Sequence, residues 1–213
     1  IAAQARVAIT ERLGFIATKD GYSMLRADAL PEDEGWNDLA FGFKYVIYAD
    51  KANDLLITPG IRYQMGNGDG EVLQGGVQEF SPFLSIAKGF GDFHILANIT
   101  GRIPLEHDRG NDIVQWDVHF DYEVFPGVAP VIEFHGLHYL DDGDALPLSV
   151  GGLDYANIGS GDVEGSTVIW MGAGARVKLT PNISVGSTFE FALTNRNADI
   201  MDNRVTVDVT LTW

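Results

Sequence analysis

The sequence contains no cysteine, so its 213 residues cannot form a disulfide framework or a thiolate metal site. Basic residues are scarce: 14 Lys and Arg stand against 30 Asp and Glu, and the formal net charge is −16. That charge would repel a phosphate backbone and excludes a nucleic-acid partner. No uncharged apolar run reaches the roughly 18 residues of a membrane-spanning helix. The chain opens without a basic, apolar signal peptide, so we expect a mature or truncated product forming one domain over residues 1–213.

The sequence has instead a strict alternation of apolar and polar residues. Its last nine residues place Val205, Val207, Val209, Leu211 and Trp213 on one face and polar residues on the other. This period of two predicts a strand with one apolar and one polar face. A terminal Trp is favoured where such a strand faces lipid, because the ring can settle at the membrane interface.

This tail resembles the C-terminal signal of bacterial outer-membrane β-barrels, in which an aromatic residue follows alternating apolar ones. The matching residues here are Val207, Val209, Leu211 and Trp213. The resemblance implies the barrel-assembly machinery as a partner and the bacterial outer membrane as the location. The stretch from Gln4 to Tyr22 also looks like a hairpin of uncharacterised outer-membrane barrels, loosely similar to transporters attached to aromatic meta-cleavage pathways. That likeness implies architecture and location but no substrate.

Strand-like segments follow one another along the whole chain. Eleven are predicted: 1–9, 13–20, 36–49, 54–66, 77–88, 93–104, 112–124, 129–140, 164–179, 183–196 and 203–213. Tight turns rich in Gly, Pro, Asn or Asp alternate with long loops over roughly 21–35, 67–76, 105–111, 141–163 and 197–202. Short turns at one end and long loops at the other are typical of an outer-membrane barrel. The predicted fold is therefore all-β, an antiparallel transmembrane β-barrel.

The first and last predicted strands run in the same direction, whereas bacterial barrels close antiparallel with an even number of strands. We therefore predict twelve strands, with one N-terminal strand outside this sequence. The alternative is a ten-stranded barrel in which residues 1–9 form a tail or plug.

Charged residues of both signs fall on the polar face. The candidate lumen and constriction residues are Lys44, Arg62, Glu79, Arg102, Asp117, His119, Asp121, Glu133, His135, Arg176, Lys178 and Glu190, and Asp208 shares their face. A charge in a narrow lumen needs a partner or water, so one interpretation is a structural network of ion pairs. The other is a selectivity constriction, in which opposed charges set a transverse field.

The densest group of titratable residues is Asp117, His119, Asp121, Glu133 and His135. A tight turn joins their two strands, so His119 should lie opposite Glu133 or His135. Such a group could form a pH-sensitive latch or hold a divalent metal. Two His among carboxylates are also common in ordinary ion-pair networks, and we assign no metal ligand here.

Aromatic residues gather at both ends of the predicted strands, as in an aromatic girdle. The girdle candidates are Trp36, Tyr63, Phe80 and Trp116 near loop ends, and Phe15, Phe93, Phe125 and Trp213 near turn ends. The loops are acidic, with Glu32, Asp33, Glu34, Asp69, Glu71, Asp141, Asp142, Asp144, Asp154, Asp162 and Glu164. We expect a solvated surface, with weak Ca²⁺ or Mg²⁺ bridging to lipopolysaccharide phosphates as the functional alternative and no other cofactor.

Catalytic motifs are not apparent. No His-x-Ser pair occurs, and neither Gly-rich stretch, 66–70 or 159–165, is followed by Lys-Ser or Lys-Thr. The chain is predicted to be a non-enzymatic outer-membrane channel or transporter for passive passage of small solutes, surrounded by membrane lipid. One alternative is an anchoring barrel with a blocked lumen, and another is a soluble β-sandwich or lipocalin-like binding protein. The sequence predicts neither the solute nor the oligomeric state.

Overall fold

The computed structural model describes residues 1–27, 30–194 and 201–213. Within them, the one helical element is a short 3-10 helix, η1 (Gly70–Val72). No helix in these ranges is long and apolar enough to cross a membrane. The strands are β1 (Ala2–Ala8), β2 (Leu13–Ala27), β3 (Leu30–Trp36), β4 (Ala40–Tyr45), β5 (Tyr48–Asp50), β6 (Leu55–Gln64), β7 (Glu79–Phe90), β8 (Phe93–Pro104), β9 (Ile113–Tyr122), β10 (Val128–Tyr139), β11 (Thr167–Thr180), β12 (Ile183–Ala192) and β13 (Asn203–Leu211).

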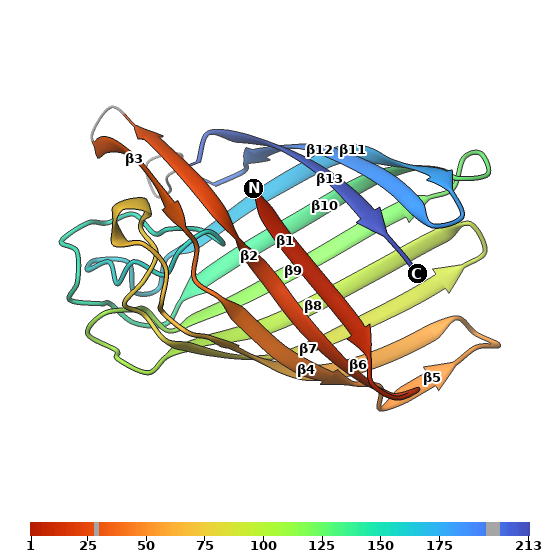
Figure 1. Cartoon of the computed structure of the whole chain (residues 1–213), viewed down its shortest axis with the longest axis horizontal. Helices are drawn as coiled ribbons and strands as arrows, with labels where there is room; N and C mark the ends of the chain where they lie inside the picture. Colours follow the sequence, from red (N-terminus) through yellow and green to blue (C-terminus); the bar gives the residue numbers. More distant parts are fainter. Residues whose placement is uncertain (28–29, 195–200) are drawn as a thin grey trace.

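The strands form one antiparallel sheet that curls round on itself (Figure 1). Its path is β1-β2-β4-β6-β7-β8-β9-β10-β11-β12-β13, with β3 paired to β2 and β5 paired to β6. These eleven consecutive strands confirm the predicted strand order. Because each neighbour is antiparallel, β1 and β13 run in the same direction at the two edges of the sheet. The twelfth strand stays a prediction.

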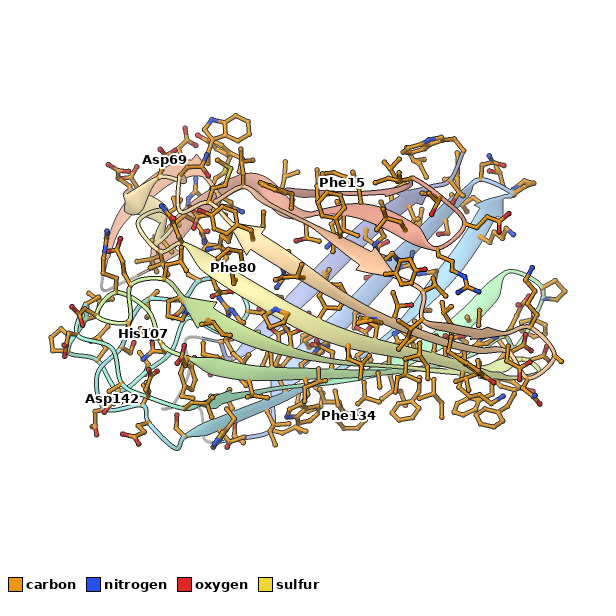
Figure 2. All side chains as sticks on the ribbon, turned by 90° about the horizontal axis from the view of Figure 1, so that it is seen from below. Phe15, Asp69, Phe80, His107, Phe134 and Asp142 are labelled. Atoms are coloured by element: carbon orange, nitrogen blue, oxygen red, sulfur yellow. The ribbon has the colours of Figure 1, made fainter. Side chains whose placement is uncertain are left out.

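The two ends of the barrel differ in their connections, as predicted. At the turn end, residues 91–92 join β7 to β8, and residues 181–182 join β11 to β12. Gly91 and Gly127 have φ values of 66° and 80°, which L side chains rarely adopt. At the loop end, residues 65–78, 105–112 and 140–166 connect successive strands. Figure 2 shows Asp69, His107 and Asp142 together at this end.

The outer face of the sheet is apolar and open to the surroundings. Phe43 is 46% exposed, Phe189 50% and Val207 66%, although each lies within a well-paired strand. Their neighbours one position along, such as Lys44 and Glu190, are half-buried or buried on the opposite face. An apolar exterior around a polar interior inverts the pattern of a soluble protein and is the pattern of a lipid-facing barrel.

Some boundaries differ from the prediction. The expected loop at 21–35 is instead a hairpin in the described residues, because β2 runs on to Ala27 and pairs with β3. Tyr22 packs edge-on against Trp36 at 5.3 Å across this extension. The predicted strand 36–49 is divided between β4 and β5, which pair separately with β6. The predicted loop at 197–202 lies largely outside the described residues, as does the end of the predicted strand 183–196.

Candidate functional site: the charged interior of the barrel

The predicted cluster on β9 and β10 lies on the inner face. Register pairs His119 with Glu133 and Asp117 with His135, which confirms the expected opposition of His119 and Glu133. His119 Nδ1 lies 2.7 Å from Glu133 Oε1, and its Nε2 lies 3.2 Å from Asp121 Oδ2. His135 Nδ1 is 2.8 Å from Asp117 Oδ1. Each imidazole thus bridges neighbouring carboxylates along the barrel wall.

His94 on β8 extends this cluster toward the turn end. Its Nδ1 lies 2.8 Å from Asp121 Oδ1, so Asp121 contacts both His94 and His119. His94 was not among the predicted lumen residues. The signal in the sequence was that His94 has the same parity as Asn98 and Arg102 and so shares their face of the strand.

A second cluster on β11, β12 and β13 centres on Glu190, which is 3% exposed. Arg204 donates to both oxygens of Glu190, from Nε and Nη2 at 2.7 Å each. Thr206 Oγ1 donates to Glu190 at 2.9 Å, and Trp170 Nε1 donates to it at 3.2 Å. The ring of Trp170 also stacks on His135 at 5.2 Å. Trp170 therefore joins the two clusters, although neither it nor Arg204 was among the predicted site residues.

Nearer the turn end, Arg176 and Asp208 form a bidentate ion pair. Nη1 and Nη2 of Arg176 lie 2.9 and 2.8 Å from the two carboxylate oxygens of Asp208. The strand between them carries Gly186, where an added Cβ would come within 2.4 Å of Asp208 Oδ1. The absence of a side chain at 186 therefore leaves room for the pair to form.

A cavity of about 220 Å³ lies between these clusters. Its lining includes His119, Glu133, His135, Arg176, Glu190, Arg204, Thr206 and Asp208. His135 Nε2 is buried and makes no hydrogen bond within the described residues. The cavity thus brings charged groups of both signs to the interior of the barrel, with His135 Nε2 3.9 Å from Glu133 Oε2 and 3.8 Å from Glu190 Oε1.

At the loop end, Arg102 and Glu79 form a buried ion pair. Arg102 Nε lies 3.0 and 3.1 Å from the two oxygens of Glu79, and the side chains are 6% and 2% exposed. Ser81 Oγ and Asn157 Nδ2 also donate to Glu79. Arg102 Nη1 donates to the carbonyl of Leu153 at 3.1 Å. Both charged groups of the pair therefore make hydrogen bonds to further groups, as a buried ion pair requires.

Leu153 and Asn157 belong to the loop at 140–166, which folds inward. Leu153 is 3% exposed and packs in a core that also contains Ile113, Leu137, Tyr139, Val163, Val168, Trp170 and Met201. Asp154 Oδ1 lies 2.8 Å from Arg204 Nη1. Tyr155 donates to the carbonyl of Val72 at 2.7 Å, across to the loop at 65–78. The loop therefore covers the interior at this end.

This arrangement corrects the expectation of a uniformly solvated acidic loop surface. Asp154 is 17% exposed and ion-paired with an interior Arg. Asp142 accepts hydrogen bonds from the backbone N–H groups of Val163 and Glu164 at 2.6 and 2.7 Å. Glu32 and Glu34 remain exposed, as expected. The charge-assisted pair with Arg204 therefore holds Asp154 inward, whereas Asp142 stays exposed.

The remaining predicted lumen residues lie apart from these clusters. Arg62 donates to Thr18 Oγ1 at 3.5 Å. Lys44 lies on β4 between Gly14 and Gly60 in register. Lys178 is exposed near the turn end. The structure does not bring these three cations into the paired network.

The predicted girdle residues lie on the outer face or at the strand ends. Tyr63 packs against Phe80 at 5.0 Å near the loop end. Phe15 meets Phe43 at 5.7 Å, and Phe93 stacks with Phe120 at 6.3 Å. Trp116 lies over Gly136, while Trp36, Phe125 and Trp213 are 65%, 69% and 90% exposed. Their role at a membrane interface stays a prediction.

No family model matches the sequence, and no curated protein matches it. Two solved structures resemble the fold. One is the COG4313 outer membrane channel from Pseudomonas putida F1, at 12% identity over 98% of this chain and 81% of that chain, with a TM-score of 0.72. The other is the NanC porin, at 9% identity over 99% of this chain and 97% of that chain, with a TM-score of 0.57. The chain has the fold of an outer-membrane β-barrel. This finding argues against the soluble sandwich, which would need two packed sheets rather than one curled sheet.

Proposed function

We propose that this barrel is a bacterial outer-membrane channel through which small polar solutes pass along the charged interior. The observation that carries the proposal is the contrast between the two faces of one sheet. Val207 and its outward neighbours offer an apolar surface to lipid, while Asp208 and its inward neighbours line a polar cavity. The similarity to an outer membrane channel and a porin supports the same function.

The arrangement of charges supports transport rather than catalysis. His119, His135, Arg176 and Arg204 each contact carboxylates, so basic and acidic side chains are neighbours around the cavity. A solute in such a cavity exchanges hydrogen bonds with fixed charges of both signs, which favours small polar or zwitterionic molecules. His135 Nε2 makes no hydrogen bond within the described residues and lies near the carboxylates of Glu133 and Glu190, so a solute donor or acceptor could engage this group. The proposed partners are membrane lipid, lipopolysaccharide and the barrel-assembly machinery.

A second candidate function is an anchoring barrel with a blocked interior. The inward loop at 140–166 favours it, because Leu153 and Asn157 fill the loop end. The two functions make different predictions about conductance, and one set of recordings separates them.

The experiment is single-channel recording in planar bilayers, at neutral and acidic pH. We expect small, discrete steps from the unchanged protein. Larger steps are expected after residues 147–161 are replaced by a short Gly-Ser linker, because this removes the contacts of Leu153, Asp154 and Asn157. A variant with Gly-Ser substituted at exposed residues 51–53 of a turn serves as the control. Verified insertion without conductance, in both the unchanged and the shortened protein, would support the anchoring function and contradict the channel.

A further inference from the structure

Three potential metal ligands meet at the loop end, outside the charged interior. His107 lies in the segment after β8, Asp112 directly precedes β9, and Asp141 follows β10. His107 Nδ1 lies 3.7 Å from Asp112 Oδ2 and 4.0 Å from Asp141 Oδ2. One ligand atom from each residue lies within 4.8 Å of the other two. Figure 2 shows His107 at the rim of the molecule, where a cation would have access from solvent.

The backbone around these residues fixes the two carboxylates relative to each other. The N–H of Asp112 donates to Asp141 Oδ1 at 2.6 Å, which leaves Asp141 Oδ2 directed elsewhere. Leu140 N–H donates to the carbonyl of Asp112 at 2.8 Å, and Asn111 Nδ2 donates to the carbonyl of Asp141 at 3.2 Å. These bonds tie the segment before β9 to the segment after β10. The carboxylates are thereby positioned independently of any ligand.

Asp112 gives a separate indication that this group binds a ligand. Its side chain is 29% exposed and Oδ2 is the oxygen near His107, but Oδ1 is buried and has no hydrogen-bond partner within the described residues. A buried carboxylate oxygen without a donor is unfavourable, and such atoms are rare in native proteins. A second carboxylate close by, that of Asp141, adds repulsion between like charges. A bound cation would offset the repulsion between the two carboxylates and the desolvation of Asp112.

We propose that His107, Asp112 and Asp141 bind a divalent transition-metal ion, of which Zn²⁺ is the best match. An imidazole nitrogen with two carboxylate oxygens is a ligand set that Zn²⁺ accepts, with water completing the coordination. Adjacent ligands of a tetrahedral site with bonds of about 2.0 Å lie roughly 3.3 Å apart. His107 is 60% exposed, so its side chain can make the small movement that closes its separations from the carboxylates.

The position of the site gives the ion a structural consequence. Asp141 begins the loop at 140–166, and His107 belongs to the loop at 105–112. An ion held by both would fasten the base of the loop that covers the interior. The site does not depend on the proposed channel function, because binding and thermal stability can be measured without conductance.

The test uses the full chain in detergent, first treated with a chelator and then titrated with ZnCl₂ by isothermal titration calorimetry. We expect one Zn²⁺ per chain, a rise in Tm on binding, and affinity at least tenfold weaker in His107→Ala and in Asp112→Asn. The matched controls are Asp108→Asn, an exposed carboxylate in the same loop, and His138→Ala, a half-buried His on β10; both should bind like the unchanged protein.

Heat-dependent gel mobility verifies that each variant is folded. Equal Zn²⁺ affinity in folded His107→Ala and in the unchanged protein would overturn the proposal. Binding of Ca²⁺ or Mg²⁺ in preference to Zn²⁺, unaffected by His107→Ala, would overturn it as well, since the site would then be built from oxygen ligands alone.

Discussion

Two Arg–carboxylate pairs in this barrel have similar nitrogen–oxygen distances but opposite surroundings. Arg102 and Glu79 at the loop end are 6% and 2% exposed, whereas Arg176 and Asp208 near the turn end are 42% and 41% exposed. The first pair is enclosed by the inward loop at 140–166, and the second faces the cavity. A buried pair depends on both charges being present, while an exposed pair is screened by water. An Arg–carboxylate pair therefore stabilises the fold at the loop end, and another one lines the cavity near the turn end.

The largest effect is expected from Arg102→Ala. It leaves Glu79 ionised, buried and without its cation, and it removes the donor to Leu153. Loss of one partner of a buried pair costs about 3–5 kcal/mol in the free energy of unfolding. Urea unfolding from lipid vesicles measures the change, and the double variant Arg102→Met with Glu79→Gln should recover much of it. A change below about 1 kcal/mol would show that the pair is hydrated.

An intermediate effect is expected from Asp154→Asn, because its pair with Arg204 is partly buried, at 17% and 32% exposed. Hydrogen bonds to charged groups contribute about 1.5–3 kcal/mol. Arg204 retains Glu190, so the barrel should stay folded while the loop at 140–166 loosens. Hydrogen exchange of this loop is the measurement, with Asp162→Asn as the matched loop control. Unchanged protection of Leu153 in Asp154→Asn would mean that the apolar core alone holds the loop.

The smallest effect on stability is expected from Asp208→Asn. Its pair with Arg176 is more than a third exposed, so its loss should change the free energy of unfolding by roughly 0–1 kcal/mol. The substitution removes one negative charge from the cavity wall, which should shift ion selectivity toward anions. Reversal potentials under a salt gradient measure that shift. Thr210→Val, beside the pair, is the control for local packing.

The sequence predicted the parts of this molecule that follow a local period. Alternation identified the strand order and assigned Asp117, His119 and Glu133 to the inner face. The short turn limited the partner of His119 to Glu133 or His135, and the structure has Glu133. These features depend on neighbours in the chain and on the pairing of consecutive strands. The hairpin of β2 and β3 was missed because its polar residues resemble a loop.

The closed loop end could not be predicted in the same way. Asp154 meets Arg204 across 50 positions, and Tyr155 meets Val72 across 83, in a loop without any period. Composition alone suggested that these acidic and Gly-rich residues would face solvent. Arg204 follows a part of the chain with no strand pattern, so its parity on β13 was the one signal for its inward position. Contacts between distant loops are set by the packed tertiary structure rather than by local sequence.

Glycine on the inner wall has a consequence for hydration. Gly172 and Gly186 stand where larger side chains would meet Glu190, Arg176 or Asp208. Gly186 lines the cavity of about 220 Å³, which is large enough to hold several water molecules. A fixed charge that contacts water can exchange the water oxygen for an oxygen of a polar solute with little change in enthalpy. Glycine on the inner wall thereby leaves room for water in the interior, and a polar solute can displace that water.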